Sequence, residues 1–199
     1  MLGKTNVKVK PNKKIVVDYV DYIESTGTQY IDTGVDPTQN TRVEIKFLSK
    51  EADKFVYGSR TSSSSSNKHC YNHNSTTKVY PQFYSFSSAV SKNVLFNEVY
   101  TLKNGKEGFY LNDTLLKTYT YSDFTSTLNM YLFGLNQNRA LERGFVGNIY
   151  YCKIYENDVL VRDLKPCKDG MDIYCMYDEV NKRFYYNQGS GSFTGGASV

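Results

Sequence analysis

Apolar and polar residues alternate in short stretches along most of the chain. The clearest run is Arg42-Val43-Glu44-Ile45-Lys46-Phe47, which has the two-residue period of a strand with one buried face. No amphipathic helical pattern of ten or more residues appears. Further strand-like stretches are 54–58, 79–86, 94–102, 108–113, 128–135, 147–155, 159–164, 173–177 and 183–186. Many short strands separated by turn signals predict an all-β fold, a two-sheet antiparallel jelly-roll sandwich.

Turn and loop signals separate these stretches. Asn104-Gly105 is typical of a tight type I′ hairpin, because both residue types tolerate positive φ angles. Glu156-Asn157-Asp158 is expected to form another turn. Residues 59–78 contain a serine run, asparagines and both histidines, so we expect a long surface loop there.

The composition is consistent with a β-rich body. The 199 residues include 19 tyrosines and 11 phenylalanines but no tryptophan, and such aromatic residues fit pleated, half-buried strand surfaces. The length favours one domain, alone or with an arm.

The net charge of +4 is concentrated at the N-terminus. Residues 1–18 hold five lysines and one aspartate, which leaves nineteen charges of each sign in the rest of the chain. A neutral body is a poor surface for phosphates, so we expect no nucleic-acid partner. The sequence therefore predicts a basic N-terminal arm, 1–18, followed by a sandwich domain, 19–199.

The arm combines charge with apolar residues. Val7-Lys8-Val9-Lys10 alternates, Pro11 interrupts the pattern, and 15–17 is apolar. A poorly ordered terminus and a peptide that adds to a neighbouring sheet edge both fit this pattern. We expect docking on another chain, either a second copy in a homo-oligomer or an acidic protein. The docking lysines would be Lys4, Lys8, Lys10, Lys13 and Lys14.

Membrane insertion and zinc binding are not expected. The start Met1-Leu2-Gly3-Lys4 is not followed by the apolar region of a signal peptide, and no apolar run approaches a membrane span in length. The four cysteines form no Cys-x-x-Cys pair. We expect Cys152, Cys167 and Cys175 to be free thiols within or beside the core.

Two strings resemble a known family. The opening Tyr22-Ile23-Glu24-Ser25-Thr26-Gly27-Thr28-Gln29-Tyr30-Ile31-Asp32-Thr33-Gly34 and the closing stretch 177–193 are similar to the laminin-G-like, concanavalin A-like domains of phage and gut-bacterial surface proteins. Weaker similarity covers 43–47, 132–134, 147–155 and 160–167. The resemblance spans residues 19–195 and leaves the arm outside it.

The resemblance implies a jelly roll of a kind that phages carry on tail fibres, tail tips or capsid-decorating proteins, where it often binds glycans. We therefore expect a non-catalytic, lectin-like virion protein for glycan or host-surface attachment. It would be assembled in the host cytoplasm, or otherwise lie on the bacterial cell surface. Its partners would be other virion proteins or further copies of itself, and a cell-surface glycan. A purely structural decoration protein without a ligand is the alternative.

A glycoside hydrolase of the same fold is a further alternative, but its carboxylates are not in place. The laminarinase-like pattern Glu-x-Asp-x-x-Glu is matched only by Glu51-Ala52-Asp53, because Val56 occupies the position of the second glutamate. We expect these carboxylates and the pair Asp178-Glu179 to be solvated turn residues. No catalytic residue is assigned, and the protein is not expected to be an enzyme.

Ligand-binding candidates lie in the expected loop. Tyrosine offers an apolar ring with a polar tip, so the loop could stack on and hydrogen-bond a sugar, while a polar loop without a ligand is the other interpretation. The candidates are His69, Tyr71, Asn72, His73 and Asn74.

No cofactor or metal site is assigned. The His-x-x-x-His spacing would face one metal only from a helix, and no third ligand is evident. Calcium binding at the rim of the jelly roll is kept as an alternative, although no spacing singles out its ligands. The available aspartates are Asp32, Asp36, Asp169 and Asp172.

Overall fold

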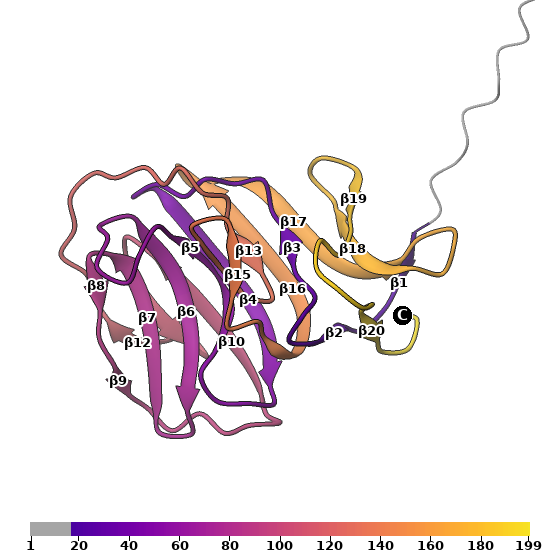
Figure 1. The fold of residues 1–199 in the computed structure, drawn as a ribbon, viewed down its shortest axis with the longest axis horizontal. Helices are drawn as coiled ribbons and strands as arrows, with labels where there is room; N and C mark the ends of the chain where they lie inside the picture. Colours follow the sequence, from indigo (N-terminus) through magenta and orange to yellow (C-terminus); the bar gives the residue numbers. More distant parts are fainter. Residues whose placement is uncertain (1–16) are drawn as a thin grey trace, which may run out of the picture.

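The computed structural model describes residues 17–199, in which every regular element is a β-strand (Figure 1). The described part of the chain accordingly holds no helix that could span a membrane. The strands are β1 (Asp18–Tyr19), β2 (Ile23–Thr26), β3 (Ile31–Asp32), β4 (Thr41–Ser49), β5 (Lys54–Arg60), β6 (Lys68–Ser75), β7 (Lys78–Tyr84), β8 (Phe86–Ser87), β9 (Val90–Ser91), β10 (Val99–Gly105), β11 (Gly108–Leu111), β12 (Thr114–Lys117), β13 (Tyr131–Leu132), β14 (Leu135–Gln137), β15 (Ala140–Glu142), β16 (Val146–Glu156), β17 (Val159–Lys168), β18 (Tyr174–Asp178), β19 (Arg183–Tyr185) and β20 (Thr194–Gly195).

The strands form two sheets that pack as a sandwich. The larger sheet has the order β12-β11-β10-β4-β16-β17-β18-β19, with β1, β2 and β20 attached at its side. The smaller sheet has the order β15-β14-β5-β6-β7-β8, with β3, β9 and β13 attached. All pairs are antiparallel except β14 with β5. The predicted all-β, two-sheet antiparallel fold is confirmed.

The predicted arm falls almost entirely outside the described residues, as do its five docking lysines. Only Val17 and Asp18 of the predicted segment 1–18 are described, and Asp18 already belongs to β1, where it pairs with Lys168. Strand β1 thus includes Asp18, the last residue of the predicted segment.

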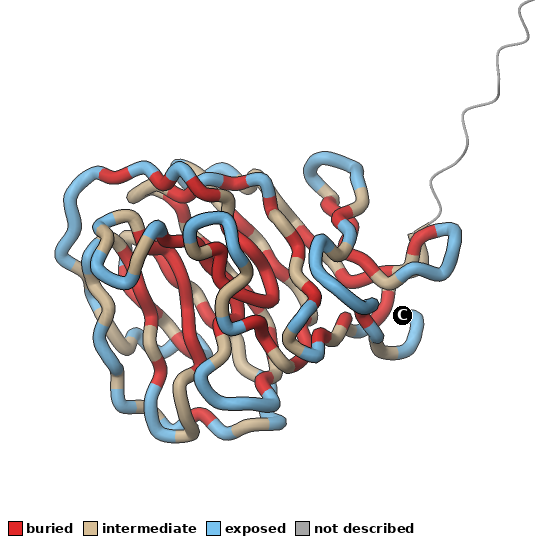
Figure 2. Tube along the Cα trace, viewed as in Figure 1, coloured by how far each residue is buried: buried red, intermediate tan, exposed pale blue. Residues whose placement is uncertain are grey.

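The core lies between the two sheets, where the buried stretches of the strands gather (Figure 2). Strand β4 alternates strictly between buried and half-buried residues, as its sequence pattern predicts. Its inward side chains include Ile45 and Phe47, both 0% exposed. The Phe47 ring meets Tyr71 of the opposite sheet edge to face, with centroids 5.6 Å apart. This contact joins the sheets near the middle of the sandwich.

The residues at 59–78 do not form a long loop, and that prediction is wrong. Only 61–67 and 76–77 connect strands, while Lys68–Ser75 is β6 in the middle of the smaller sheet. Burial of Lys68, Asn72 and the two histidines of β6 is tolerated because each side chain has at least one hydrogen-bond partner in the protein. Lys68 is 2% exposed, and its ammonium donates to the carbonyls of Ser63 and Ser65 at 3.2 and 2.7 Å.

A chain of hydrogen bonds crosses the interior from His69. The His69 Nε2 lies 3.1 Å from the Thr41 carbonyl, which can only accept, so Nε2 carries the proton. The unprotonated Nδ1 then accepts from the Tyr57 hydroxyl at 3.2 Å. That hydroxyl accepts from the Asn104 amide at 2.8 Å, and Tyr119 donates to Asn104 Oδ1 at 2.7 Å. These hydrogen bonds fix His69 in the tautomer that is protonated at Nε2.

This chain of hydrogen bonds also explains why the turn does not form at Asn104-Gly105. The predicted hairpin forms, but Gly105 pairs with Gly108, so the turn residues are Lys106 and Glu107. Asn104 stays in β10 because its amide is needed in the interior. Positive φ angles of the type I′ kind occur instead at 112–113 and at 157–158, the second being a predicted turn.

The expected central strand at 128–135 is interrupted. Phe133 has a φ angle of 68°, which separates β13 from β14. A non-glycine residue in this region cannot continue a strand. Phe133 is fully buried, and its ring lies 4.8 Å from that of Phe193. The break therefore directs an aromatic side chain into the core.

Both ends of the described chain lie at one end of the sandwich (Figure 1). Val20 forms a bridge with Ser198, and β2 pairs with β20. The predicted closing hairpin is confirmed, with Tyr177 opposite Phe184 in β18 and β19.

The cysteines are buried free thiols in the structure. Cys152 belongs to the main core, whereas Cys167 and Cys175 form a small separate cluster with Tyr177. Cys167 and Cys175 are direct cross-strand partners with sulfur atoms 3.6 Å apart. Burial raises the pKa of Cys70 to about 12, which makes that thiol a poor nucleophile at neutral pH.

Candidate functional site

The sequence-predicted binding residues do not form a surface site. His69, Tyr71, Asn72 and His73 lie in β6 and are at most 3% exposed; Asn74, near the strand end, is half-buried. His73 Nε2 bonds the Val94 carbonyl at 3.0 Å, and the Tyr71 ring stacks on Phe109. Side chains held in this way offer no surface to a sugar approaching from solvent.

Two of the four aspartates considered for calcium, Asp32 and Asp169, organise turns. Asp169 Oδ1 accepts from the backbone N–H groups of Met171 and Ile173, and Oδ2 accepts from the Tyr186 hydroxyl at 2.9 Å. Asp32 similarly accepts from the Gly34 N–H at 2.8 Å. No group of three or more His, Cys, Asp or Glu side chains with metal-binding geometry occurs within residues 17–199.

The two carboxylate pairs considered for glycoside hydrolysis differ in their exposure to solvent. Glu51 and Asp53 lie in an exposed turn, as expected, where Asp53 pairs with Arg143 at 2.7 Å. Asp178 is not solvated, and that prediction is wrong. It is 0% exposed, because its carboxylate accepts from the N–H groups of Asp163 and Val180 at 3.0 Å.

The outer face of the larger sheet, the face turned away from the core, combines aromatic and charged side chains. The alternation of β4 directs Arg42, Glu44 and Lys46 to this face. Lys46 is the register partner of Thr101 on β10 and of Tyr151 on β16. The face is therefore built by strands that are far apart in sequence.

Side chains of alternating charge form a row across this face. Lys103 on β10 pairs in register with Glu44 on β4, and Glu44 pairs with Lys153 on β16. Lys153 faces Asp163 on β17 in turn. Tyr110 on β11 extends the row beyond Lys103. Opposite charges on neighbouring strands stabilise this register.

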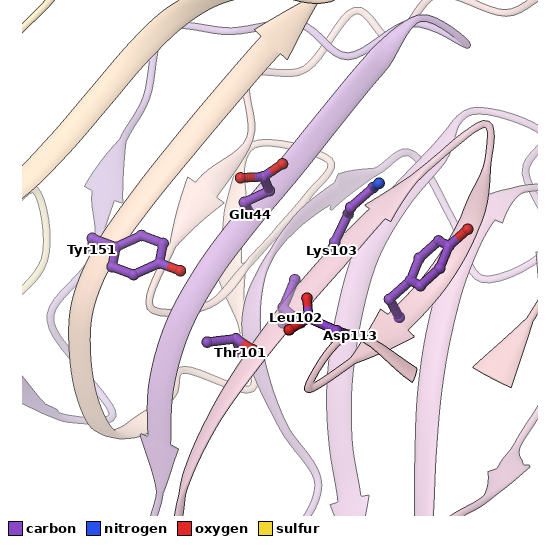
Figure 3. A pocket seen from close by; sticks show the side chains of 7 residues that line it. Glu44, Thr101, Leu102, Lys103, Asp113 and Tyr151 are labelled. Atoms are coloured by element: carbon purple, nitrogen blue, oxygen red, sulfur yellow. The ribbon is translucent and has the colours of Figure 1, made fainter. Parts of the chain in front are cut away.

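A hollow of about 360 Å³ opens on the outer face, and we refer to it as the central hollow. Figure 3 shows Tyr151 on one side of it, Lys103 and Asp113 on the other, and Glu44 between them. The lining residues are Glu44, Thr101, Leu102, Lys103, Tyr110, Asp113 and Tyr151.

The tyrosine rings of the face are flanked by cations. The Lys103 ammonium lies 4.8 Å from the centroid of the Tyr110 ring, and the Lys153 ammonium lies 6.0 Å from that of Tyr151. Such cation–π contacts contribute about 0.5–1 kcal/mol each at exposed sites. They help to fix the orientation of the rings that border the hollow.

The hydroxyl of Tyr151 stays protonated at neutral pH. Partial burial raises the pKa of Tyr151, and the nearby carboxylates of Glu44 and Asp113 raise it further. The hollow therefore presents a hydroxyl donor, two carboxylate acceptors and the Lys103 ammonium beside aromatic rings. This set of groups can hold a ligand with many hydroxyls and an apolar ring face.

The sequence contained part of this site. The polar positions of the 42–47 alternation include Glu44 and Lys46, so their exposure on one face follows from the pattern. Tyr110 and Tyr151 carry no local signal of their own. Their place beside Glu44 depends on strand register, which a single sequence does not reveal.

Comparison with known proteins shows similarity at the level of fold. No protein-family model matches the chain, and no curated protein matches it. The structure is similar to that of a candidate carbohydrate-binding protein from Bacteroides ovatus ATCC 8483, with a TM-score of 0.64 and 11% sequence identity. The similarity covers 92% of this chain but 62% of the other, so the chain spans less than two thirds of its structural neighbour.

Proposed function

We propose that the protein is a non-catalytic carbohydrate-binding module and that the central hollow is its binding site. The observation that carries this proposal is the grouping of Tyr110 and Tyr151 around Glu44, Lys103 and Asp113 on the outer face. The structural neighbour, itself a candidate carbohydrate-binding protein, supports the same class of ligand.

Sugar chemistry matches the groups in the central hollow. One face of a pyranose ring is lined by C–H groups and packs on an aromatic ring, while its hydroxyls both donate and accept hydrogen bonds. Glu44 and Asp113 can accept from such hydroxyls, and Lys103 can donate to them. A sheet surface also holds these side chains rigidly, so little conformational entropy is lost on binding.

We expect Tyr151→Ala to weaken glycan binding about tenfold or more, since removing a central aromatic side chain typically has the largest effect in a binding site. A broad glycan array on the purified chain would identify the ligand, and calorimetry would compare the variants. Tyr151→Phe keeps the ring and should retain most of the affinity. Tyr80→Ala, a half-buried tyrosine on β7 of the smaller sheet, is the matched control.

Wild-type affinity in Tyr151→Ala would place the site elsewhere. Silence across the array would favour the alternative of a structural decoration protein without a ligand. Release of reducing sugar from polysaccharides would instead favour a glycoside hydrolase.

The finer proposal is display on a phage particle, on a tail fibre or in capsid decoration, for attachment to a host-surface glycan. Support comes from the resemblance at 22–34 and 177–193 and from the five lysines before residue 17, which would dock on virion proteins or on further copies of the chain. That segment joins the sandwich at β1, which pairs with β17 rather than with the strands bearing the central hollow's two tyrosines, β11 and β16. Docking there would leave free the strands that bear the two tyrosines of the central hollow.

We expect deletion of residues 1–16 to abolish incorporation into the particle or to change the oligomer mass, without changing glycan affinity. Light scattering and mass spectrometry of purified particles would measure both assembly properties. If the shortened chain keeps its oligomer mass and its incorporation, the lysine-rich segment has no docking role.

A further inference from the structure

A second hollow lies on the outer face of the larger sheet. This terminal hollow has a volume of about 340 Å³ and lies where β1 joins β17. It resembles the central hollow in size and, like it, is bordered by tyrosine, lysine and aspartate. Its lining residues are Tyr19, Val20, Asp21, Tyr150, Lys165, Pro166 and Val199.

A β-bulge in β16 joins the two hollows. Ile149 pairs with Phe47 and Tyr151 pairs with Lys46, so Tyr150 is an extra residue between two neighbouring pairs. Tyr150 borders the terminal hollow and Tyr151 borders the central hollow. The Lys46 ammonium lies 5.2 Å from the centroid of the Tyr150 ring. Lys46 therefore sits between both tyrosines, and both hollows open on the same face.

The hollows repeat one arrangement of groups. In the central hollow the Lys103 ammonium lies 4.8 Å from the centroid of the Tyr110 ring. In the terminal hollow the Lys165 ammonium lies 5.9 Å from that of Tyr19. Each hollow is also lined by an aspartate. A surface that presents the same groups twice is suited to a ligand that repeats the same chemical unit.

The two hollows together span more than a single sugar. Tyr110 lies on β11 and Lys165 on β17, and β10, β4 and β16 lie between these strands in the sheet. Four strand spacings of about 4.8 Å give roughly 19 Å across the face. Only a chain of several sugars fills both hollows.

Charges balance along this path. The acidic side chains that line the hollows are Glu44, Asp113 and Asp21, and the basic ones along the path are Lys103, Lys46 and Lys165. Lys153 and Asp163 of the charged row add one charge of each sign. A polyanionic glycan gains no net attraction from such a surface and brings its own charges close to three carboxylates. An uncharged chain, which can hydrogen-bond to groups of both signs, fits better.

We propose that the outer face binds an internal stretch of an extended, uncharged polysaccharide that runs across the strands and fills both hollows. This inference rests on the proposed carbohydrate-binding function and adds the length and charge class of the ligand. A single terminal sugar would occupy the central hollow alone and leave the terminal hollow empty.

The test uses ladders of α-glucan, β-glucan, xylan and mannan oligosaccharides, from monosaccharide to octasaccharide, and an oligogalacturonate ladder as the charged probe. Calorimetry measures the Kd of each member for the wild type, for Lys165→Ala and for the control Lys78→Ala, an exposed lysine on β7. We expect affinity for a neutral ladder to rise with length until both hollows are filled. Lys165→Ala should weaken binding of the longest members about tenfold and leave the shortest unchanged.

Two outcomes overturn the inference while the proposed function stands. The first is equal affinity of the wild type for short and long oligosaccharides. The second is wild-type affinity of Lys165→Ala for oligosaccharides of every length. In both cases Tyr151→Ala must still lose binding. If oligogalacturonates bind more tightly than every neutral ladder, the inference that the ligand is uncharged is wrong. Absence of binding by all ladders overturns the inference, and a silent glycan array in addition overturns the proposed function itself.

Discussion

We expect Gly58→Ala to lower the free energy of unfolding by about 4 kcal/mol or more. Gly58 lies in β5 with a φ angle of +148°, which L residues rarely adopt. A Cβ atom at this position would lie 2.0 Å from the Cβ and 2.7 Å from the Cα of Cys70 on the neighbouring strand. Because β5 and β6 are central strands of the smaller sheet, relief of this overlap requires them to separate and so disturbs the core.

Thermal unfolding measures this effect, which corresponds to a melting temperature lower by about 8–16 °C for a chain of this size. Gly170→Ala is the matched control, because an added Cβ there meets nothing within 4 Å. We expect the control to change stability by less than about 0.5 kcal/mol. A Gly58→Ala variant as stable as the control would contradict the close approach of β5 and β6.

The fold class could be predicted from sequence because most strands have one polar and one apolar side. In β4 the side chains point alternately to the core and to the outer face. The sequence pattern therefore predicts both the secondary structure and the orientation of the strand. The turn at Asn157-Asp158 was equally visible, since both residue types tolerate positive φ angles.

Strand β6 could not be recognised because its polar residues are buried. Composition marks Lys68, His69, Asn72 and His73 as surface residues, yet none is more than 3% exposed. Each is tolerated inside only through a partner supplied by another segment, such as the Thr41 carbonyl for His69. A single sequence does not show such partners, so a buried polar strand and a polar loop look alike.

The candidate site was missed for a related reason. Glu44 and Tyr151 are far apart in the chain, and they meet because β16 pairs with β4 in one register. The bulge at Tyr150 then shifts that register by one residue, so that Tyr150 and Tyr151 border neighbouring hollows. Local patterns predict which face a side chain takes within its strand, whereas the site depends on how several strands align.

The second large effect that we expect is a loss of stability in mild acid. Burial lowers the pKa of His69 to about 4, because the charged ring would lose its hydration inside the sandwich. The neutral ring also fits the hydrogen-bond chain, in which Nδ1 accepts from Tyr57 and so has no place for a second proton. Burial likewise lowers the pKa of His73.

The direction of this effect follows from the pKa difference. In the unfolded chain His69 takes up its proton near its usual value of 6.5, whereas the folded protein resists protonation down to about 4. The contribution to stability is therefore complete above pH 6.5 and decreases as the pH falls toward 4. The difference corresponds to about 3 kcal/mol for His69.

The Glu179 carboxylate contributes to the pH dependence of stability in a lower pH range. Hydrogen bonds from Lys182 and Tyr19 lower the pKa of Glu179 from 4.5 to about 2, so its contribution is lost only below pH 4.5. Stability that is lost between pH 6.5 and 4.5 is thus distinguishable from the effect of Glu179. Tyr19 and Glu179 also join β1 to the turn after β18, so the terminal hollow should persist until that lower range.

Urea unfolding at a series of pH values from 7.5 to 4 measures the loss. His69→Gln, which cannot be protonated, should be less stable at neutral pH because it breaks the buried chain, but its stability should fall less steeply between pH 6.5 and 4.5. The slope that remains would belong to His73. If the wild type and His69→Gln lose stability in parallel over this range, His69 titrates alike in the folded and unfolded chain, and its burial as a neutral side chain is refuted.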